Sequence, residues 1–105
     1  MISGGAGVVV AGTLRATKGV THPVMKAMEA MAIASRAEDG CEVYSYARDV
    51  FDPTLIRVFE VWRDMPSFQT HRAMPHLKAW RAKWHDLGLG EADLTTYEIA
   101  IRAPV

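Results

Sequence analysis

The chain has 105 residues, half of them hydrophobic, and its 12 basic and 12 acidic side chains give a formal net charge of zero. This length suits one domain, over residues 1–105, that buries roughly two thirds of the surface its unfolded chain exposes. Because basic and acidic residues are interspersed, no surface for nucleic acid or anionic lipid is indicated.

Cys41 is the only cysteine, which excludes an intramolecular disulfide and suits a reducing compartment. The apolar run at residues 8–11 is too short for a signal or membrane span, so we expect a soluble, unprocessed, cytoplasmic protein.

The amino-terminal third predicts one strand and one helix. Residues 7–17 are rich in β-branched side chains and predict a buried strand, preceded by a flexible segment at residues 1–6. Residues 23–36 carry apolar side chains at helical spacing and predict a helix, with Thr21 or His22 as its N-cap.

A hairpin is predicted next. Residues 41–50 and 55–62 each alternate in polarity, as strands do. The segment Phe51-Asp52-Pro53-Thr54 between them has the composition of a turn. The alternation in residues 55–62 places four side chains on one face of that strand: Ile56, Val58, Glu60 and Trp62.

The carboxyl-terminal part predicts helices followed by a last strand. Asp64 and Pro66 begin a short helix, and Pro75 opens or kinks a second helical segment that ends near Gly88. Residues 93–102 alternate again. The order βαββαβ predicts the ferredoxin-like α+β fold, an antiparallel sheet with both helices on one face. Because the other face also carries apolar side chains, we expect self-association, as a homodimer.

Several short motifs between residues 40 and 76 carry a resemblance to a known family. They are Gly40-Cys41 with Tyr44 three residues on, Arg48-Asp49, Asp52-Pro53, Glu60-x-Trp62, and His71 followed by Pro75-His76. With these motifs the chain resembles, over most of its length, the antibiotic biosynthesis monooxygenase family of dimeric α+β barrel proteins. The resemblance implies homodimers whose sheets pack face to face, with a pocket for a small substrate in each subunit. Members that oxygenate polycyclic phenols or quinols use no flavin or metal, whereas other relatives degrade haem, isomerise sugar-derived carbonyl compounds, or have no known substrate.

The haem-degrading branch of that family can be compared at three positions. Where that branch has an asparagine in its first strand, this chain has Gly12, and where it has a pocket tryptophan, this chain has His71. Its iron-binding histidine falls at Arg81. Because arginine cannot serve as an axial imidazole ligand, we do not expect haem degradation.

Oxygenation without a cofactor requires a base that deprotonates a phenol or enol, so that the resulting anion can pass an electron to O2. His71 is the natural candidate, because an imidazole titrates near pH ~6.5, and we expect Glu60 to orient it. Arg48 or Arg81 would stabilise a phenolate. The predicted substrate contacts are Trp62, Tyr44, Tyr46, His76 and Arg81. The sequence therefore predicts a monooxygenase that acts on a small aromatic with O2, without cofactor or metal.

Other interpretations fit the same residues. His71 can cap or pack on its helix, and Glu60 can pair with Arg57 or Arg72 on the surface. The chain's histidines share no predicted face, so no metal site is expected. The pair His71 and Glu60 also suits an isomerase or tautomerase of a small carbonyl compound, and the fold suits a dimer that binds a metabolite without catalysis.

Overall fold

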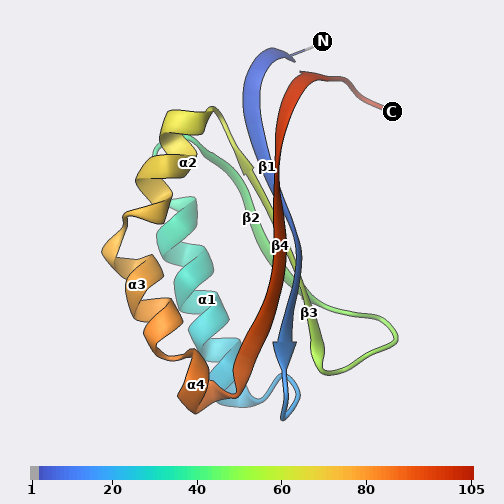
Figure 1. Cartoon of the computed structure of the whole chain (residues 1–105), viewed down its shortest axis with the longest axis vertical. Helices are drawn as coiled ribbons and strands as arrows, with labels where there is room; N and C mark the ends of the chain where they lie inside the picture. Colours follow the sequence, from blue (N-terminus) through green and yellow to red (C-terminus); the bar gives the residue numbers. More distant parts are fainter. Residues whose placement is uncertain (1–2) are drawn as a thin grey trace.

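The computed structural model describes residues 3–105, with side chains from Gly7 onward. Its elements, in chain order, are β1 (Ser3–Ala16), α1 (His22–Arg36), β2 (Cys41–Arg48), β3 (Leu55–Trp62), α2 (Met65–Arg72), α3 (Pro75–Ala82), α4 (Trp84–Leu87) and β4 (Leu89–Arg102). The strands form one antiparallel sheet in the order β2-β3-β1-β4. The helices all lie on one face of this sheet (Figure 1). This arrangement confirms the predicted ferredoxin-like α+β fold.

Strands β1 and β4 are longer than the sequence pattern indicates. The strand predicted from Gly7 begins at Ser3, which pairs with Arg102 of β4. Residues 1–6 were expected to be flexible. Residues 3–6 instead belong to β1, and residues 1–2 lie outside the described residues. β4 begins at Leu89, opposite Ala16. Pairing with a neighbouring strand extends both strands into glycine-containing segments that have no clear alternation of their own.

Helix α1 follows its predicted pattern. Its N-cap is Thr21, whose hydroxyl oxygen accepts a hydrogen bond from the N–H of Val24 at 3.4 Å. Its buried residues recur at helical spacing and face the sheet: Val24, Met28, Met31 and Ser35. Burial of each apolar side chain of this size contributes about 1.5–3 kcal/mol, so α1 is held mainly by this stripe.

The second helical region is divided into three helices. α2 begins after Asp64, whose carboxylate accepts the N–H of Ser67 at 2.8 Å. Pro75, which has no N–H to donate, starts α3. The helix predicted to continue from there is interrupted at Lys83, and α4 ends at Gly88 in the left-handed conformation, φ 72°. Among the described residues, no helix combines the length and apolar character needed to cross a membrane.

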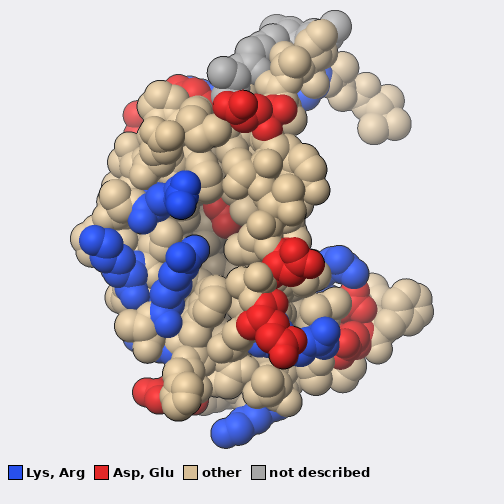
Figure 2. All heavy atoms as spheres, viewed as in Figure 1, with Lys and Arg blue, Asp and Glu red and all other residues tan. Residues whose placement is uncertain are grey.

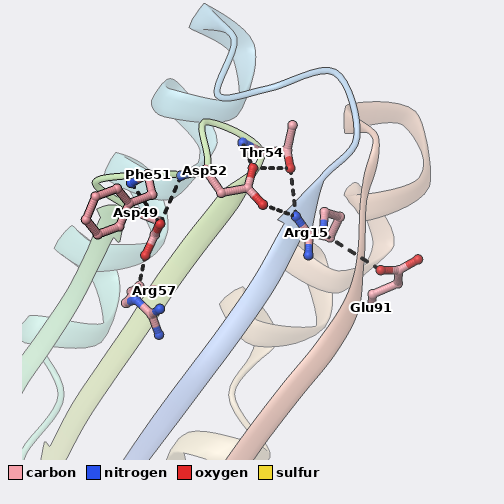
Figure 3. Close-up of polar contacts among 7 residues, drawn as sticks. All are labelled: Arg15, Asp49, Phe51, Asp52, Thr54, Arg57 and Glu91. Carbon is pink, nitrogen blue, oxygen red and sulfur yellow. Dashed lines mark hydrogen bonds and ion pairs between the residues drawn. The ribbon is translucent and has the colours of Figure 1, made fainter.

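The turn between β2 and β3 is held by two aspartates (Figure 3). Asp49 accepts two backbone N–H groups of the turn at 2.9 Å and the Nε of Arg57 at 3.0 Å. Asp52 accepts the N–H of Thr54 at 2.9 Å and pairs with Arg15 of β1 at 2.7 Å. The local bonding expected from the turn composition is confirmed, and the ion pair ties the turn to the adjacent strand.

The sheet face opposite the helices, called the outer face below, is uncovered in this chain (Figure 1). It carries large apolar side chains that are substantially exposed: Val43 (39%), Phe59 (45%), Tyr97 (52%) and Ile101 (69%). The register aligns Val43, Val61, Val9 and Tyr97 in one row across all four strands. The outer face is therefore a continuous apolar surface.

Candidate functional site

A cavity of about 260 Å³ lies between the sheet and the helices α2, α3 and α4. This volume is just below the range of ~300–1,000 Å³ typical of ligand sites, so it suits a small molecule. Its aromatic walls come from β2 and from all three helices: Tyr44, Tyr46, Phe68, Trp80 and Trp84. Such walls favour a flat ligand.

Besides the two tyrosines, four ionisable side chains contribute to the cavity lining. Glu60 of β3 and His71 of α2 are buried, with 6% and 2% of their surface exposed, whereas Arg72 and Arg81 are exposed. In Figure 2, basic side chains gather over α2 and α3 beside a hollow in which acidic atoms are visible. The cavity therefore has a carboxylate and an imidazole in its interior and two guanidinium groups nearer to solvent.

His71 is held in place by Glu38. It lies in the last turn of α2, and its Nδ1 is 2.6 Å from Oε2 of Glu38. A contact this short to a carboxylate oxygen requires a proton on Nδ1, so in the neutral ring the lone pair is on Nε2. The rings of Trp62 and Tyr44 lie 4.5 and 5.6 Å from the His71 ring, centroid to centroid. The imidazole is thus fixed in orientation, with its free nitrogen on the side of Glu60.

Glu60 is near His71 but does not bond to it. Its Oε1 is 3.9 Å from Nε2 of His71 and accepts a hydrogen bond from Nε1 of Trp62 at 2.9 Å. Burial raises the pKa of the Glu60 carboxyl, against the lowering effects of the Trp62 hydrogen bond and of His71. Arg57, one expected surface partner of Glu60, pairs with Asp49 instead. Glu60 is therefore a buried carboxyl whose proton affinity is increased, next to the free nitrogen of His71.

Glu38 reaches the site from the turn between α1 and β2. Gly40 in the same turn has φ 87°, and a Cβ there would collide with the side chain of Ser67 at the start of α2. The absence of a side chain at Gly40 lets α2 approach the turn closely. The peptide N–H of Arg63 also donates to the carbonyl oxygen of Gly40 at 2.8 Å. This close approach brings His71 within reach of Glu38.

Glu38 also contacts His76, at 2.8 Å from Nε2 to the same Oε2. Glu38, His71 and His76 thus offer three possible metal ligands within 4.8 Å of one another. Ligands on a tetrahedral ion with bonds of about 2.0–2.1 Å would lie about 3.3 Å apart. The distances of 2.6 and 2.8 Å are shorter and are typical of hydrogen bonds. The arrangement is therefore that of the Glu38 carboxylate accepting hydrogen bonds from the imidazoles of His71 and His76.

The comparisons with known proteins agree with the motifs. Residues 7–83 match the sequence profile of the family described as antibiotic biosynthesis monooxygenase. The chain belongs to this family. A Deinococcus radiodurans protein named as a candidate antibiotic biosynthesis monooxygenase has a solved structure that is 26% identical, with a TM-score of 0.85 over 93% of this chain and 97% of that chain.

Two further relatives of this antibiotic biosynthesis monooxygenase family chain are informative. A Caulobacter crescentus structure, also named as a candidate member, is 22% identical, with a TM-score of 0.80 and 92% of each chain covered, and it shows the same fold. An uncharacterised Synechocystis protein is 28% identical over 93 residues, or 89% of this chain. The chain spans 63% of the length of that relative.

The structure divides the predicted substrate contacts of this family member into two groups. Tyr44, Tyr46 and Arg81 line the cavity. Burial raises the pKa of both tyrosines, and their hydroxyl groups lie 2.9 Å apart. Trp62 is 0% exposed, so its indole supports Glu60 from within the core. His76 bonds Glu38 and lines a separate surface hollow beside α1. Trp62 and His76 are therefore positioned to support the site from outside the cavity surface.

Two residues of the site were not identified in these roles from the sequence. Glu38 follows the helix predicted for residues 23–36. The sequence assigns it only to the end of that helix, because no periodic pattern extends through a turn. Arg72 was considered only as a surface partner of Glu60, but it lines the cavity and lies over the ring of Phe68, with its Cζ 5.8 Å from the ring centroid. The Glu38 to His71 contact joins residues 33 positions apart, and no local signal indicates such a pair.

Proposed function

We propose that the chain is a cofactor-independent monooxygenase of a small phenol or quinol and works as a homodimer, with His71 as its base. The observation that carries the proposal is the buried imidazole of His71, held through Nδ1 by Glu38 at 2.6 Å beside an aromatic-walled cavity. A base with one nitrogen fixed by a carboxylate and the other free is the arrangement that general base catalysis requires.

The proposed reaction converts a phenol with a free para carbon into a quinone. Nε2 of His71 takes the hydroxyl proton, and the phenolate passes one electron to O2. The resulting radical and superoxide combine at the para carbon, giving a hydroperoxide after protonation. Loss of water, with the para hydrogen, leaves the second carbonyl group. In sum, one phenol and one O2 give one quinone and one water, and no external reductant is needed.

The other residues of the cavity have supporting roles in this proposal. Tyr44 and Tyr46 stay protonated because burial raises the pKa of each hydroxyl, so they can donate hydrogen bonds to the ligand. Glu60, whose pKa is raised by burial, can carry the proton that the peroxide requires. The proposal assigns binding to the aromatic walls and proton transfer to His71 and Glu60.

The test is oxygen uptake by the purified protein, without added cofactor, on a panel of hydroquinones, naphthols and anthrones. We expect uptake well above the autoxidation rate and a loss of about 100-fold or more in His71→Ala, the scale of general base catalysis. His85→Ala is the matched control, because the side chain of His85 is fully exposed and, among the described residues, pairs only with its neighbour Asp86. Equal uptake by His71→Ala and the native protein would refute the role of His71.

A second candidate is an isomerase or tautomerase of a small carbonyl compound. It is favoured by one observation, the 3.9 Å separation between His71 and a carboxyl whose pKa is raised, because an acid and a base this close can move a proton between two ligand atoms. Turnover that continues without O2 would support this candidate over the monooxygenase. Ligand binding without turnover in either assay would indicate a binding protein.

A further inference from the structure

The arginines of this chain differ in how they are paired. Five bond to an acceptor: Arg15, Arg36, Arg57, Arg63 and Arg102. Within residues 7–105, no hydrogen bond or ion pair joins Arg48, Arg72 or Arg81 to another side chain. Of these three, Arg72 and Arg81 line the cavity, and Arg48 does not. Two guanidinium groups without a hydrogen-bond or ion-pair partner therefore lie at a cavity whose one lining carboxyl, among the described residues, is Glu60, on which Arg81 acts only at longer range.

Both cavity arginines are positioned by aromatic rings. The Cζ of Arg72 lies 5.8 Å from the ring centroid of Phe68, and the Cζ of Arg81 lies 5.9 Å from that of Trp84. Phe68 and Trp84 also line the cavity. A guanidinium over a ring face is attracted to it while its N–H groups at the edge stay free to donate. The two arginines are thus held by cation–π contacts and retain their hydrogen-bonding capacity.

We propose that Arg72 and Arg81 bind a carboxylate group of the ligand, so that the substrate is a hydroxylated aromatic acid. The planar fork of a guanidinium matches the two oxygens of a carboxylate, and such charge-assisted bonds are stronger than neutral ones. The aromatic walls hold the ring, and a cavity of about 260 Å³ limits it to about one or two fused rings.

The burial of the groups along the cavity indicates the direction of the ligand. Glu60 lies in the interior, where a ligand carboxylate would lose its hydration beside another carboxyl group, whereas Arg72 and Arg81 are exposed. The carboxylate therefore points outward and the hydroxyl group inward, toward Nε2 of His71. This orientation rests on the proposed function, but carboxylate recognition by the two arginines does not.

The test measures binding without turnover. Calorimetry under argon compares 5-hydroxy-2-naphthoate, whose para carbon is free, with its carboxamide, which has nearly the same shape without the charge. We expect the acid to bind about tenfold more tightly, and we expect Arg72→Gln and Arg81→Gln each to weaken binding of the acid about 5- to 10-fold, the scale of a charge-assisted bond at a partly exposed site. Binding of the carboxamide should not change. Arg48→Gln is the matched control, since Arg48 also has no partner among residues 7–105 but lies outside the cavity lining.

Equal binding of acid and carboxamide by the native protein would overturn the proposal, and so would an equal loss in Arg48→Gln. Oxygen uptake on both compounds separates this inference from the proposed function. Arginine-dependent preference for the acid without uptake would support carboxylate recognition and count against the monooxygenase. Uptake that needs His71, with no preference between the two compounds, would support the monooxygenase and overturn carboxylate recognition by the two arginines.

Discussion

At the scale of single residues, Glu38 connects the two histidines beside the cavity. Its side chain is 5% exposed, and one oxygen, Oε2, accepts from both His71 and His76. The other oxygen, Oε1, is buried and has no hydrogen-bond partner in the described part of the chain. Because a buried carboxylate is costly unless it is paired, the two imidazoles provide most of the compensation for its charge. His76 therefore contacts the same oxygen of Glu38 that holds His71, and it does not line the cavity.

We expect Glu38→Gln to lower kcat/KM about 100-fold, because the carboxylate that fixes the tautomer of His71 is lost. Nitrogen-15 NMR of the imidazole should find the proton on Nδ1 of His71 in the native protein and a mixture of tautomers in the variant. Asp39→Asn is the control, since Asp39 is an adjacent carboxylate paired with Arg63 at the surface. A native His71 protonated mainly on Nε2 would contradict the assigned role of Glu38.

At the scale of elements, the β2–β3 turn links three strands. Asp52 bonds within the turn and to Arg15 of β1, and Arg15 approaches Glu91 of β4 at 3.8 Å (Figure 3). The hydroxyl and N–H of Thr54, followed by Arg15, hold the pKa of Asp52 at about 2, below its ordinary value of 3.8. The charged form of Asp52 is therefore the form that stabilises the turn.

Asp52→Asn should lower the melting temperature at neutral pH. Because the folded-state pKa is depressed, the contribution of Asp52 is fully present above its unfolded-state pKa near 3.8 and is lost as the pH falls through about 2. The difference in melting temperature between variant and native protein should therefore be constant above about pH 5 and shrink as the pH falls toward 2. Thermal unfolding followed by circular dichroism across this range checks the prediction. A difference that does not depend on pH would mean that the charge of Asp52 is not the cause.

At the scale of the whole molecule, the two faces of the sheet differ in what covers them. The helix-covered face holds the cavity, and the outer face carries the apolar row that crosses all four strands, with Val43 and Tyr97 exposed at its two ends. Apolar surface of this extent is costly in water and marks an interaction surface. We propose that a second copy of the chain covers it, which leaves the cavity of each subunit on the opposite side of its sheet.

Phe59→Asp should weaken this dimer by about 100-fold or more, since a buried unpaired charge costs several kcal/mol. Phe59 is 45% exposed at the centre of the outer face. Ile33→Asp is the matched control, because Ile33 is 64% exposed on α1, away from the sheet. Sedimentation equilibrium of the three proteins gives the dissociation constants. A native protein that is monomeric at micromolar concentration would refute the proposed dimer.

Much of the fold was predictable because the signals that define its elements are local. The helical spacing of Val24, Met28 and Met31 indicates the face of α1 that packs on the sheet. The two-residue period of β3 places Glu60 on the same face as Val58, and both line the cavity. The single helix predicted from Pro75 is divided, however, because its end turns toward β4 at Lys83.

The sequence by itself determined the order of the strands, the side chains of β3 that share a face, and the candidacy of His71 and Glu60, because periods of 2 and 3.6 residues and family motifs are readable along the chain. The tertiary structure alone decided which carboxylate holds His71. The close packing of α2 against the turn at Gly40 brings Glu38 to Nδ1, while the strand geometry leaves Glu60 at 3.9 Å from Nε2. Contacts of this kind depend on how elements far apart in the chain pack together, and no local period records them.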